Sequence, residues 1–228
     1  LGVPVATNDN CGILLVTNNA PTQFPHGTTP VTWTVVDTSS NSTTCTQLVT
    51  VVDHEQPAIY CPSNIVAYTS DDGSNNCSTM VTITPATATD NCDSPGAITI
   101  SGARSDFLAL TNPYPKGVTT IAWTAVDTST NQITCFQTVT VLDDEQPIIT
   151  CPTNIVAYTS DDGTNDCSTT VTITPATATD NCDSPGAITI TGTRSDFLAL
   201  TNPYPKGLTT IAWTAVDTST NQITCFQT

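Results

Sequence analysis

The chain is built on a sequence repeat of ninety residues, and this period constrains its fold more than any other feature. Residues 61–138 and 151–228 differ at only seven positions. The segment before Cys61 matches the second half of the same repeat, because several of its residues stand ninety positions before their counterparts: Trp33, Asp37, Cys45 and Asp53 precede Trp123, Asp127, Cys135 and Asp143. Such similarity indicates tandem duplication of one folding module.

The period also predicts the domain boundaries. We expect the C-terminal part of a repeat at 1–56, a complete repeat at 57–146, and a repeat that lacks its last strand at 147–228. The chain is therefore interpreted as a window on a longer array. Neighbouring repeats are its expected partners, because each repeat of an array contacts the next.

Within one repeat, apolar and polar residues alternate with a period of two, and Pro, Gly and Asn bound the alternating runs. This pattern is typical of β-strands, which we expect in five segments: 64–69, 79–84, 97–100, 118–126 and 133–142. Each repeat has one tryptophan, and we expect Trp123 and Trp213 to lie in the cores of their repeats. The predicted fold class is all-β, with tandem immunoglobulin-like β-sandwich repeats held by disulfides.

Charge and hydropathy argue against nucleic acid and against a membrane span. The chain carries 4 Lys and Arg against 20 Asp and Glu, a net charge of -16, so phosphate backbones would be repelled and nucleic acid is not expected. No apolar stretch approaches the roughly 18 residues that a membrane span needs. Residues 1–10 also lack the features of a signal peptide.

Regularly spaced cysteines predict disulfides and an extracellular location, because such bridges persist in oxidising compartments. The cysteines expected to be bonded are Cys61, Cys77, Cys92, Cys135, Cys151, Cys167, Cys182 and Cys225. Structural zinc is disfavoured, since the cysteines stand about 15 or more residues apart and the repeat has no histidine.

The pairing of these cysteines stays open in the sequence. One possibility joins Cys61 to Cys135 and Cys77 to Cys92, and its rival joins Cys92 to Cys135 and Cys61 to Cys77. A third possibility is a crosslink from Cys77 to Cys151 of the next repeat, which would make the array a covalent ladder.

Several short runs resemble the hyalin repeat, an immunoglobulin-like module of extracellular proteins. They are residues 143–147, Cys151-Pro152, 178–182, 204–207, 215–217 and 221–225. With four cysteines per repeat and an acidic, Thr-rich composition, the chain also resembles the tandem repeats of giant bacterial surface adhesins, including the gliding-motility adhesin. The resemblance implies adhesion or spacing at the cell surface.

Acidic residues gather where sandwich topology places the ends of adjacent repeats together. Carboxylates that meet at a junction repel one another unless a hard cation with oxygen ligands neutralises them, which predicts calcium. The candidate ligands are Asp53, Glu55, Asp90 and Asp127 at the first junction, and Asp71, Asp72, Asp143, Glu145, Asp180 and Asp217 at the second. The alternative is that these residues are ordinary solvated turns.

The sequence offers little for catalysis. His26 and His54 occupy positions that hold Lys116 and Asp144 in the next repeat, and Ser105 has neither nucleophile-elbow glycines nor a histidine in its repeat. We therefore expect a structural stalk or filament segment rather than an enzyme, and copies of the chain could also associate laterally.

The alternative function is that each repeat binds polysaccharide or protein. Such surfaces need exposed aromatic residues. Most aromatic residues of the repeat are predicted to lie at core-like positions, the set being Tyr68, Tyr114, Phe107, Phe136 and Trp123.

Overall fold

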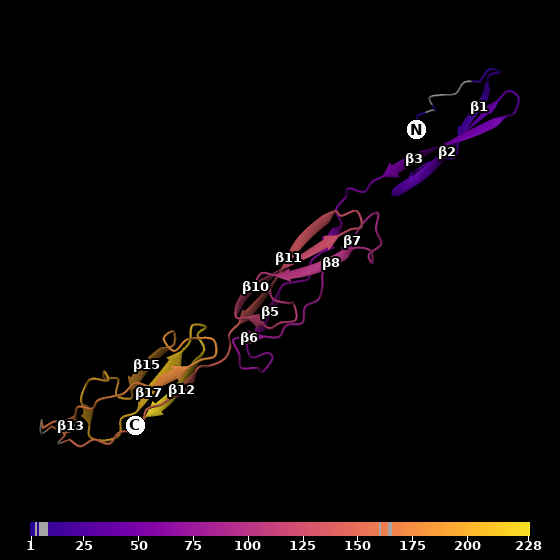
Figure 1. The fold of residues 1–228 in the computed structure, drawn as a ribbon. Helices are drawn as coiled ribbons and strands as arrows, with labels where there is room; N and C mark the ends of the chain where they lie inside the picture. The colour runs from indigo at the N-terminus through magenta and orange to yellow at the C-terminus, as the bar shows by residue number, and fades with distance from the viewer. Residues whose placement is uncertain (3, 5–8, 160, 164–165) are drawn as a thin grey trace. The chain divides into compact units, whose positions relative to one another are not determined.

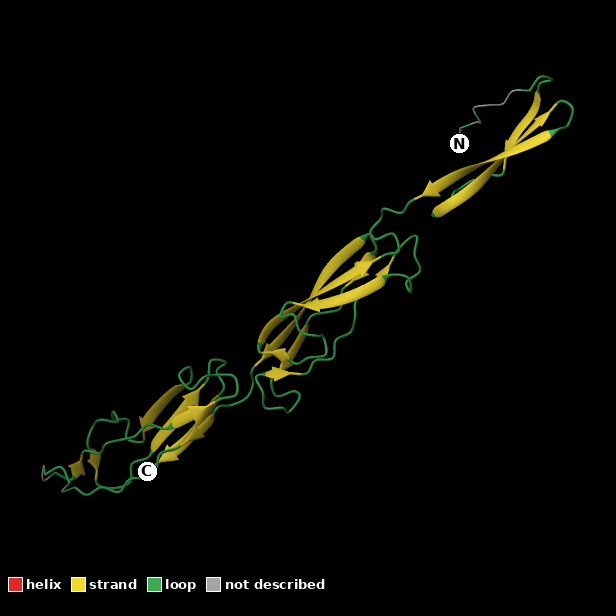
Figure 2. Ribbon diagram, in the orientation of Figure 1, coloured by secondary structure: helices red, strands yellow, loops and turns green. Residues whose placement is uncertain are grey.

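The structure is a computed structural model that describes all residues except 3, 5–8, 160 and 164–165. Every regular element among the described residues is a β-strand (Figures 1 and 2). These residues form two compact units. One contains residues 1–60, 86–101 and 124–135, and the other contains residues 61–85, 102–123 and 136–228. In the described part of the chain, no helix could cross a membrane.

The N-terminal segment is one antiparallel sheet of three strands in chain order. Its strands are β1 (Ile13–Asn18), β2 (Gly27–Asp37) and β3 (Ser42–Val51). The β2–β3 ladder runs without interruption from Gly27 opposite Val51 to Val36 opposite Ser42. Val31 and Trp33 on β2 are the buried residues of this sheet, as the alternation of the strand requires.

The middle repeat contains a four-stranded sheet in the order β5-β11-β10-β8. These strands are β5 (Ile65–Tyr68), β8 (Thr99–Arg104), β10 (Gly117–Val126) and β11 (Gln132–Leu142). Two antiparallel pairs complete the repeat: β4 (Ala58–Tyr60) with β7 (Thr87–Thr89), and β6 (Ser78–Thr79) with β9 (Tyr114–Pro115). The strands β5 and β11, which come first and last along the chain, are neighbours in this sheet and run parallel.

The core of this repeat lies between its sheets. Ala88 on β7 and Ala125 on β10 form a buried cluster with Ile98, and Ile59 on β4 and Ile133 on β11 pack against it. The cluster therefore joins the β4–β7 pair to the four-stranded sheet. This face-to-face packing confirms the predicted all-β, immunoglobulin-like sandwich.

The last repeat follows the same plan. Its strands are β12 (Ile148–Thr150), β13 (Ser168–Thr169), β14 (Thr177–Thr179), β15 (Thr189–Arg194), β16 (Tyr204–Pro205), β17 (Ile211–Val216) and β18 (Gln222–Gln227). They form the sheets β12-β14, β13-β16 and β15-β17-β18. Ala178, Ile188 and Ala215 repeat the cluster of the middle repeat at ninety-residue offsets.

Four of the five expected strands are present, and the strand expected at 79–84 is wrong. Only Ser78–Thr79 forms a strand there, and β7 begins at Thr87. The alternation of burial through Val81 and Ile83 is present, but the backbone has no partner strand. Alternation reports which side of an extended chain is covered, and it does not report whether another strand lies alongside.

The expected core positions are right for tryptophan and wrong for two phenylalanines. Trp123 is 2% exposed, whereas Phe107 is 96% exposed and Phe136 is 67% exposed. Phe107 has a φ of 62° at the turn after Arg104, where its N–H donates to the Arg104 carbonyl, 3.1 Å away. The left-handed backbone of this turn leaves the ring in solvent.

The disulfides correct two expectations. Cys151 bonds to Cys225, and Cys61 and Cys135 are also in disulfides, but Cys77 bonds to Cys182 of the next repeat rather than to Cys92 or Cys151. Cys92 and Cys167, both expected to be bonded, carry free thiols, as do Cys11 and Cys45. Cys77 and Cys92 lie in different loops of one repeat, and Cys77 contacts the Asp-Asn-Cys loop of the repeat that follows.

Candidate cation sites at the repeat junctions

Asp143 is the centre of the junction between the middle and last repeats. It follows β11 directly and is 7% exposed. Its Oδ2 accepts from Lys116 Nζ at 3.2 Å and from Ser219 Oγ at 3.1 Å, and its backbone carbonyl accepts from Asn221 Nδ2 at 3.2 Å. A linker residue is thus held by side chains from both repeats.

Three further carboxylates surround Asp143. Asp143, Asp180, Asp183 and Asp217 can each place an oxygen within 4.8 Å of the others. Lys116 supplies one positive charge to the four carboxylates, at 3.2 Å from Asp143 and 3.9 Å from Asp183. Three negative charges are left uncompensated. Oxygen ligands at this density suit a hard divalent cation.

Local turns fix the orientation of these carboxylates. Asp180 Oδ1 accepts from the N–H groups of Cys182 at 2.7 Å and Asp183 at 3.0 Å. Asp180 Oδ2 is buried and accepts no hydrogen bond from the described residues. Asp217 holds both the backbone and the side-chain amide of Asn221, at 2.7 and 2.8 Å. Asx-type turns of this kind follow from the local order of residues. The turn at Asp180 leaves its Oδ2 without a hydrogen-bond partner among the described residues.

Asp183 stays ionised more readily than an isolated aspartate. The backbone N–H of Thr218, 2.8 Å from Oδ2, lowers the pKa of Asp183, and the Thr218 hydroxyl and Lys116 act in the same direction against the effect of burial. At the first junction, the N–H and hydroxyl of Thr128 likewise lower the pKa of Asp93. A low carboxylate pKa keeps both positions available to a cation near neutral pH.

The junction between the N-terminal segment and the middle repeat has a related arrangement. Asp53, Asp90 and Cys92 can place ligand atoms within 4.8 Å of one another. The carbonyl of Asp53 accepts from Asn131 Nδ2 at 3.4 Å, as Asp143 does from Asn221. Burial and the neighbouring acidic residues, Asp53 first among them, raise the pKa of the Cys92 thiol.

The other predicted ligands divide into two groups. Asp127 lies at the first junction and binds Asn131 with both carboxylate oxygens, while Glu55 and Glu145 accept hydrogen bonds from the side chains of Asn91 and Asn181. These three residues lie in the junction loops, with oxygens already engaged.

Asp71 and Asp72 are not brought into the clusters. Asp71 accepts from the N–H of Tyr68 at 2.7 Å, and Asp72 accepts from Ser74 and Met80 within its own loop. The hydrogen bonds from Ser74 lower the pKa of Asp72. The linker carboxylates reach the end of β5 instead, where Asp143 Oδ1 accepts from Thr69 Oγ1 at 3.4 Å and Asp144 Oδ2 accepts from Ser70 Oγ at 2.8 Å.

The sequence reading missed Asp183 and Lys116 as junction residues. Asp183 directly follows the Asp-Asn-Cys run, and this adjacency was the available signal. Lys116 occurs in the run Tyr-Pro-Lys-Gly, which by itself predicts only a turn. Its place beside Asp143 depends on tertiary structure.

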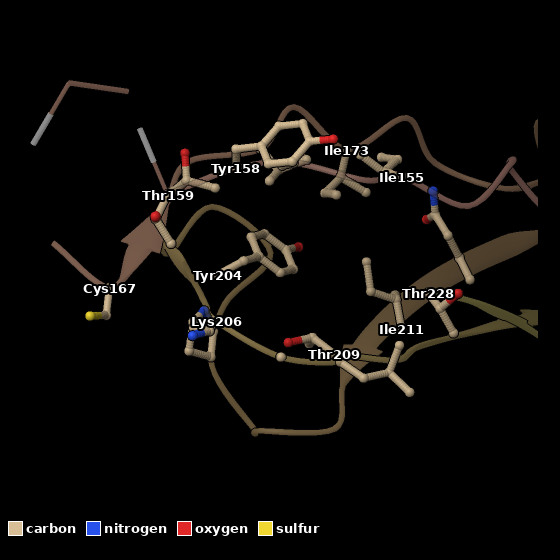
Figure 3. Close-up of a pocket in the computed structure, with 17 residues that line it drawn as sticks. Ile155, Tyr158, Thr159, Cys167, Ile173, Tyr204, Lys206, Thr209, Ile211 and Thr228 are labelled. Carbon is tan, nitrogen blue, oxygen red and sulfur yellow. The ribbon is translucent and has the colours of Figure 1, made fainter. Parts of the chain in front are cut away.

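A pocket of about 450 Å³ lies in the last repeat (Figure 3). Ile155, Tyr158, Tyr204, Ile211 and Thr228 are among its lining residues, and the labelled apolar side chains face one another across it. In the middle repeat, Val139–Leu142 of β11 lies along Ile65–Tyr68, the counterparts of 155–158. The pocket therefore occupies the position of a strand, and we do not interpret it as a ligand site.

Comparison with known proteins shows which family and which relatives these repeats resemble. The HYR domain model matches residues 4–51 and 52–141. Hyalin from Strongylocentrotus purpuratus is 31% identical over 218 residues, which cover 92% of this chain and 17% of hyalin. Hyalin from Lytechinus variegatus is 28% identical over 229 residues, covering 97% and 40%. The mouse protein named sushi, von Willebrand factor type A, EGF and pentraxin domain-containing protein 1 is 31% identical over 180 residues, covering 76% and 4%.

Solved structures of cadherin repeats show a weaker similarity. A protocadherin gammaB7 EC3-6 structure has a TM-score of 0.40 at 14% identity and covers 97% of this chain and 69% of its own. Human CDH23 EC21-23 has a TM-score of 0.40 at 15% identity, covering 88% and 73%. We draw nothing further from a similarity of this size. The matched HYR residues make up more than half of the chain, which therefore belongs to the HYR domain family.

Proposed function

We propose that this chain is a structural segment of an extracellular adhesive protein, in which HYR repeats form a stalk or spacer. The observation that carries the proposal is the Cys77–Cys182 disulfide, which spans 105 residues and joins consecutive repeats. A bridge inside one sandwich protects that sandwich alone, whereas a bridge between repeats limits how far the two can separate. That property suits a protein under tension.

The disulfides also support an extracellular location. Six cysteines are bonded, and structural bridges of this kind persist in oxidising compartments. The net charge of -16 keeps such a chain soluble and opposes random association of copies. Nothing in the proposed role requires catalysis.

Calcium is the proposed cation of the second junction. Asp143, Asp180, Asp183 and Asp217 bring four carboxylates together against the single charge of Lys116. A bound cation would relieve their repulsion and restrain Asp143, which links β11 to the last repeat. The proposed effect is a stiffer junction, with the sandwich cores unchanged.

The test is to follow the flexibility of the whole chain by small-angle scattering in millimolar calcium and in chelator. We expect greater flexibility in chelator, and the same increase in Asp180→Asn with calcium present, while far-ultraviolet circular dichroism keeps its β-signal. Asp161→Asn, in an exposed loop of the last repeat, is the matched control. Equal flexibility with calcium and with chelator would contradict the calcium proposal.

The covalent link has a separate test. The Cys77→Ser, Cys182→Ser double variant should extend further than the natural chain when pulled at its ends in a single-molecule experiment. Cys167→Ser, which removes a free thiol, should behave as the natural chain does. Identical extension of the double variant and the natural chain would remove the main support for the stalk.

One observation favours the alternative of a binding module. Phe107 and Phe197 are 96% and 90% exposed at equivalent turns, each with a left-handed backbone. Exposed aromatic residues repeated every ninety positions could contact a polysaccharide, a partner protein or a second copy lying alongside. A glycan array probed with the chain and with Phe107→Ser, Phe197→Ser tests this, since binding lost in the variant would support a module.

The resemblance to gliding-motility adhesins is a narrower proposal. It rests on the near-identical acidic, Thr-rich repeats. Deletion of the gene in its source organism, followed by an assay of surface attachment and movement, would test it.

A further inference from the structure

The middle and last repeats share a loop that the N-terminal segment lacks. The loop covers residues 105–113 and 195–203, and its sequence is identical in the two repeats. In the N-terminal segment the equivalent stretch is residues 21–23, three residues in place of nine. The sheet of β1, β2 and β3 forms without the additional residues, so the sheet does not require the loop.

The register of the strands establishes this correspondence. The tryptophan of each sheet lies opposite Asn18 on β1 and opposite Gly192 on β15. Two residues further along, Ala20 and Arg194 therefore occupy equivalent positions. In both sheets an aromatic residue followed by proline precedes the tryptophan by nine positions, which fixes the other end of the stretch.

A buried arginine holds the loop in one conformation. The Arg104 side chain is 0% exposed, and its guanidinium carbon lies 3.7 Å from the centre of the Tyr114 ring. All five of its N–H groups donate within the loop, to the carboxylate of Asp106 and to the carbonyls of Ala109, Asn112 and Pro113. The two repeats that have the loop have this arginine, whereas the segment without the loop has alanine at the same position.

The loop places a phenylalanine in solvent at its tip. Phe107 and Phe197 are 96% and 90% exposed, with φ angles of 62° and 61°. Bulky side chains rarely adopt this left-handed region because it costs free energy, and an exposed ring leaves apolar surface in water. A loop that the sheet does not require, held in place despite both costs, indicates a preformed binding element.

A second exposed ring lies on the adjoining sheet. The register of the last repeat places Thr193, Ala212 and Phe226 in one row, on the face opposite Trp213. Phe226 is 66% exposed, and Thr193 directly precedes the arginine that holds the loop. The N-terminal segment has Thr46 at the position of Phe226. Both exposed rings are thus features of the same two repeats.

Charge and repetition select the class of ligand. A net charge of -16 repels polyanions and opposes association with a second copy of this chain. One exposed ring contributes little affinity, but an identical loop in successive repeats gains avidity from a ligand whose own structure repeats. A polymer of neutral sugars meets both conditions, and the apolar faces of its sugar rings stack on aromatic rings. We propose that these loops bind a neutral polysaccharide, with Phe107 and Phe197 as the stacking residues.

This inference rests on the alternative of a binding module, to which it gives a ligand class. It does not depend on calcium at Asp143 or on the bridge between repeats. The Cys77→Ser, Cys182→Ser variant should bind polysaccharide as the natural chain does, so failure of the stalk tests and failure of this inference are separate results.

The test is retention of the 228-residue chain by insoluble cellulose and chitin, and by gels that contain xyloglucan, galactomannan, laminarin or dextran. We expect retention by at least one of these neutral polymers and none by alginate or heparin. The Phe107→Ser, Phe197→Ser double variant should bind at least about tenfold more weakly, and each single variant should lose less. Leu48→Ser removes a side chain that is 68% exposed on the N-terminal sheet and should bind as the natural chain does.

Three results would overturn the inference. One is the absence of retention by every neutral polymer, and another is equal retention of the natural chain and the double phenylalanine variant. The third is self-association, or binding to phosphatidylcholine vesicles, that disappears in the double variant while no polysaccharide binds. That result would assign the loop to a different partner.

Discussion

A Cβ atom on Gly192 would lie 2.6 Å from Cζ3 of Trp213 and 2.9 Å from its Cε3, and Gly102 stands in the same relation to Trp123. Glycine is therefore required on β15 and β8 by the tryptophan ring of the neighbouring strand. Because the ring is buried and its Nε1 donates to Gln227 Oε1 at 3.1 Å, we expect Gly192→Ala to lower the free energy of unfolding by about 1–3 kcal/mol.

Urea unfolding monitored by tryptophan fluorescence measures this effect. Gly186→Ala is the matched control, since a Cβ there meets nothing within 4 Å. Equal stability of the two variants would show that the ring adjusts without cost.

The buried glutamines opposite the tryptophans should also be sensitive. Gln137 is 1% exposed, accepts from Trp123 Nε1 at 3.1 Å and donates to the Ser63 carbonyl at 2.7 Å. Gln137→Leu leaves the Trp123 Nε1–H donor and the Ser63 carbonyl acceptor without partners. We expect the free energy of unfolding to fall by roughly 1–3 kcal/mol for each of these groups. Gln132→Leu, at an exposed end of the same strand, should change stability little in the same unfolding assay.

The Cys151–Cys225 disulfide should stabilise the fold mainly by lowering the conformational entropy of the unfolded chain. It closes a loop across a sequence separation of 74, for which the chain-entropy estimate gives about 4 kcal/mol. We expect the Cys151→Ala, Cys225→Ala double variant to unfold at a correspondingly lower urea concentration. Cys167→Ala removes an exposed free thiol and should unfold as the natural chain does. A shift of similar size in both variants would argue against the disulfide as the cause.

Stability in acid should depend on Asp106. Its Oδ1 accepts from Arg104 Nε at 2.9 Å, and this hydrogen bond lowers the pKa of Asp106. A lowered carboxylate pKa contributes stability above the unfolded value near 3.9, and that stability is lost as pH falls through the folded pKa. Asp106→Asn should therefore be less stable than the natural chain at neutral pH, with the difference shrinking below about pH 4.

Urea midpoints measured across this pH range test the sign. Asp161→Asn, where the side chain accepts from the Tyr158 backbone N–H and contacts no arginine, is the comparison. A difference between Asp106→Asn and the natural chain that stays constant through the acid range would mean that the ion pair with Arg104 is not its source.

Much of the fold follows from the sequence because its evidence is local or periodic. Alternation along 118–126 and 133–142 predicts β10 and β11, and the ninety-residue offset predicts that the last repeat copies the middle one. Asx-type turns at Asp90 and Asp180 also follow from the order of residues along the chain.

Partners distant in sequence were decided by tertiary structure. Cys77 has Cys92 as its nearer partner in sequence, yet the loops of one repeat meet those of the next and it bonds to Cys182. The sequence predicts a core position for Phe107, but the turn after Arg104 places its side chain in solvent. The sequence by itself determined the β-repeat, its period and its acidic character, because each depends on neighbouring residues or on copying. Only the tertiary structure decided which loops touch, and hence that Lys116 lies beside Asp143, because such contacts depend on the path of the whole chain.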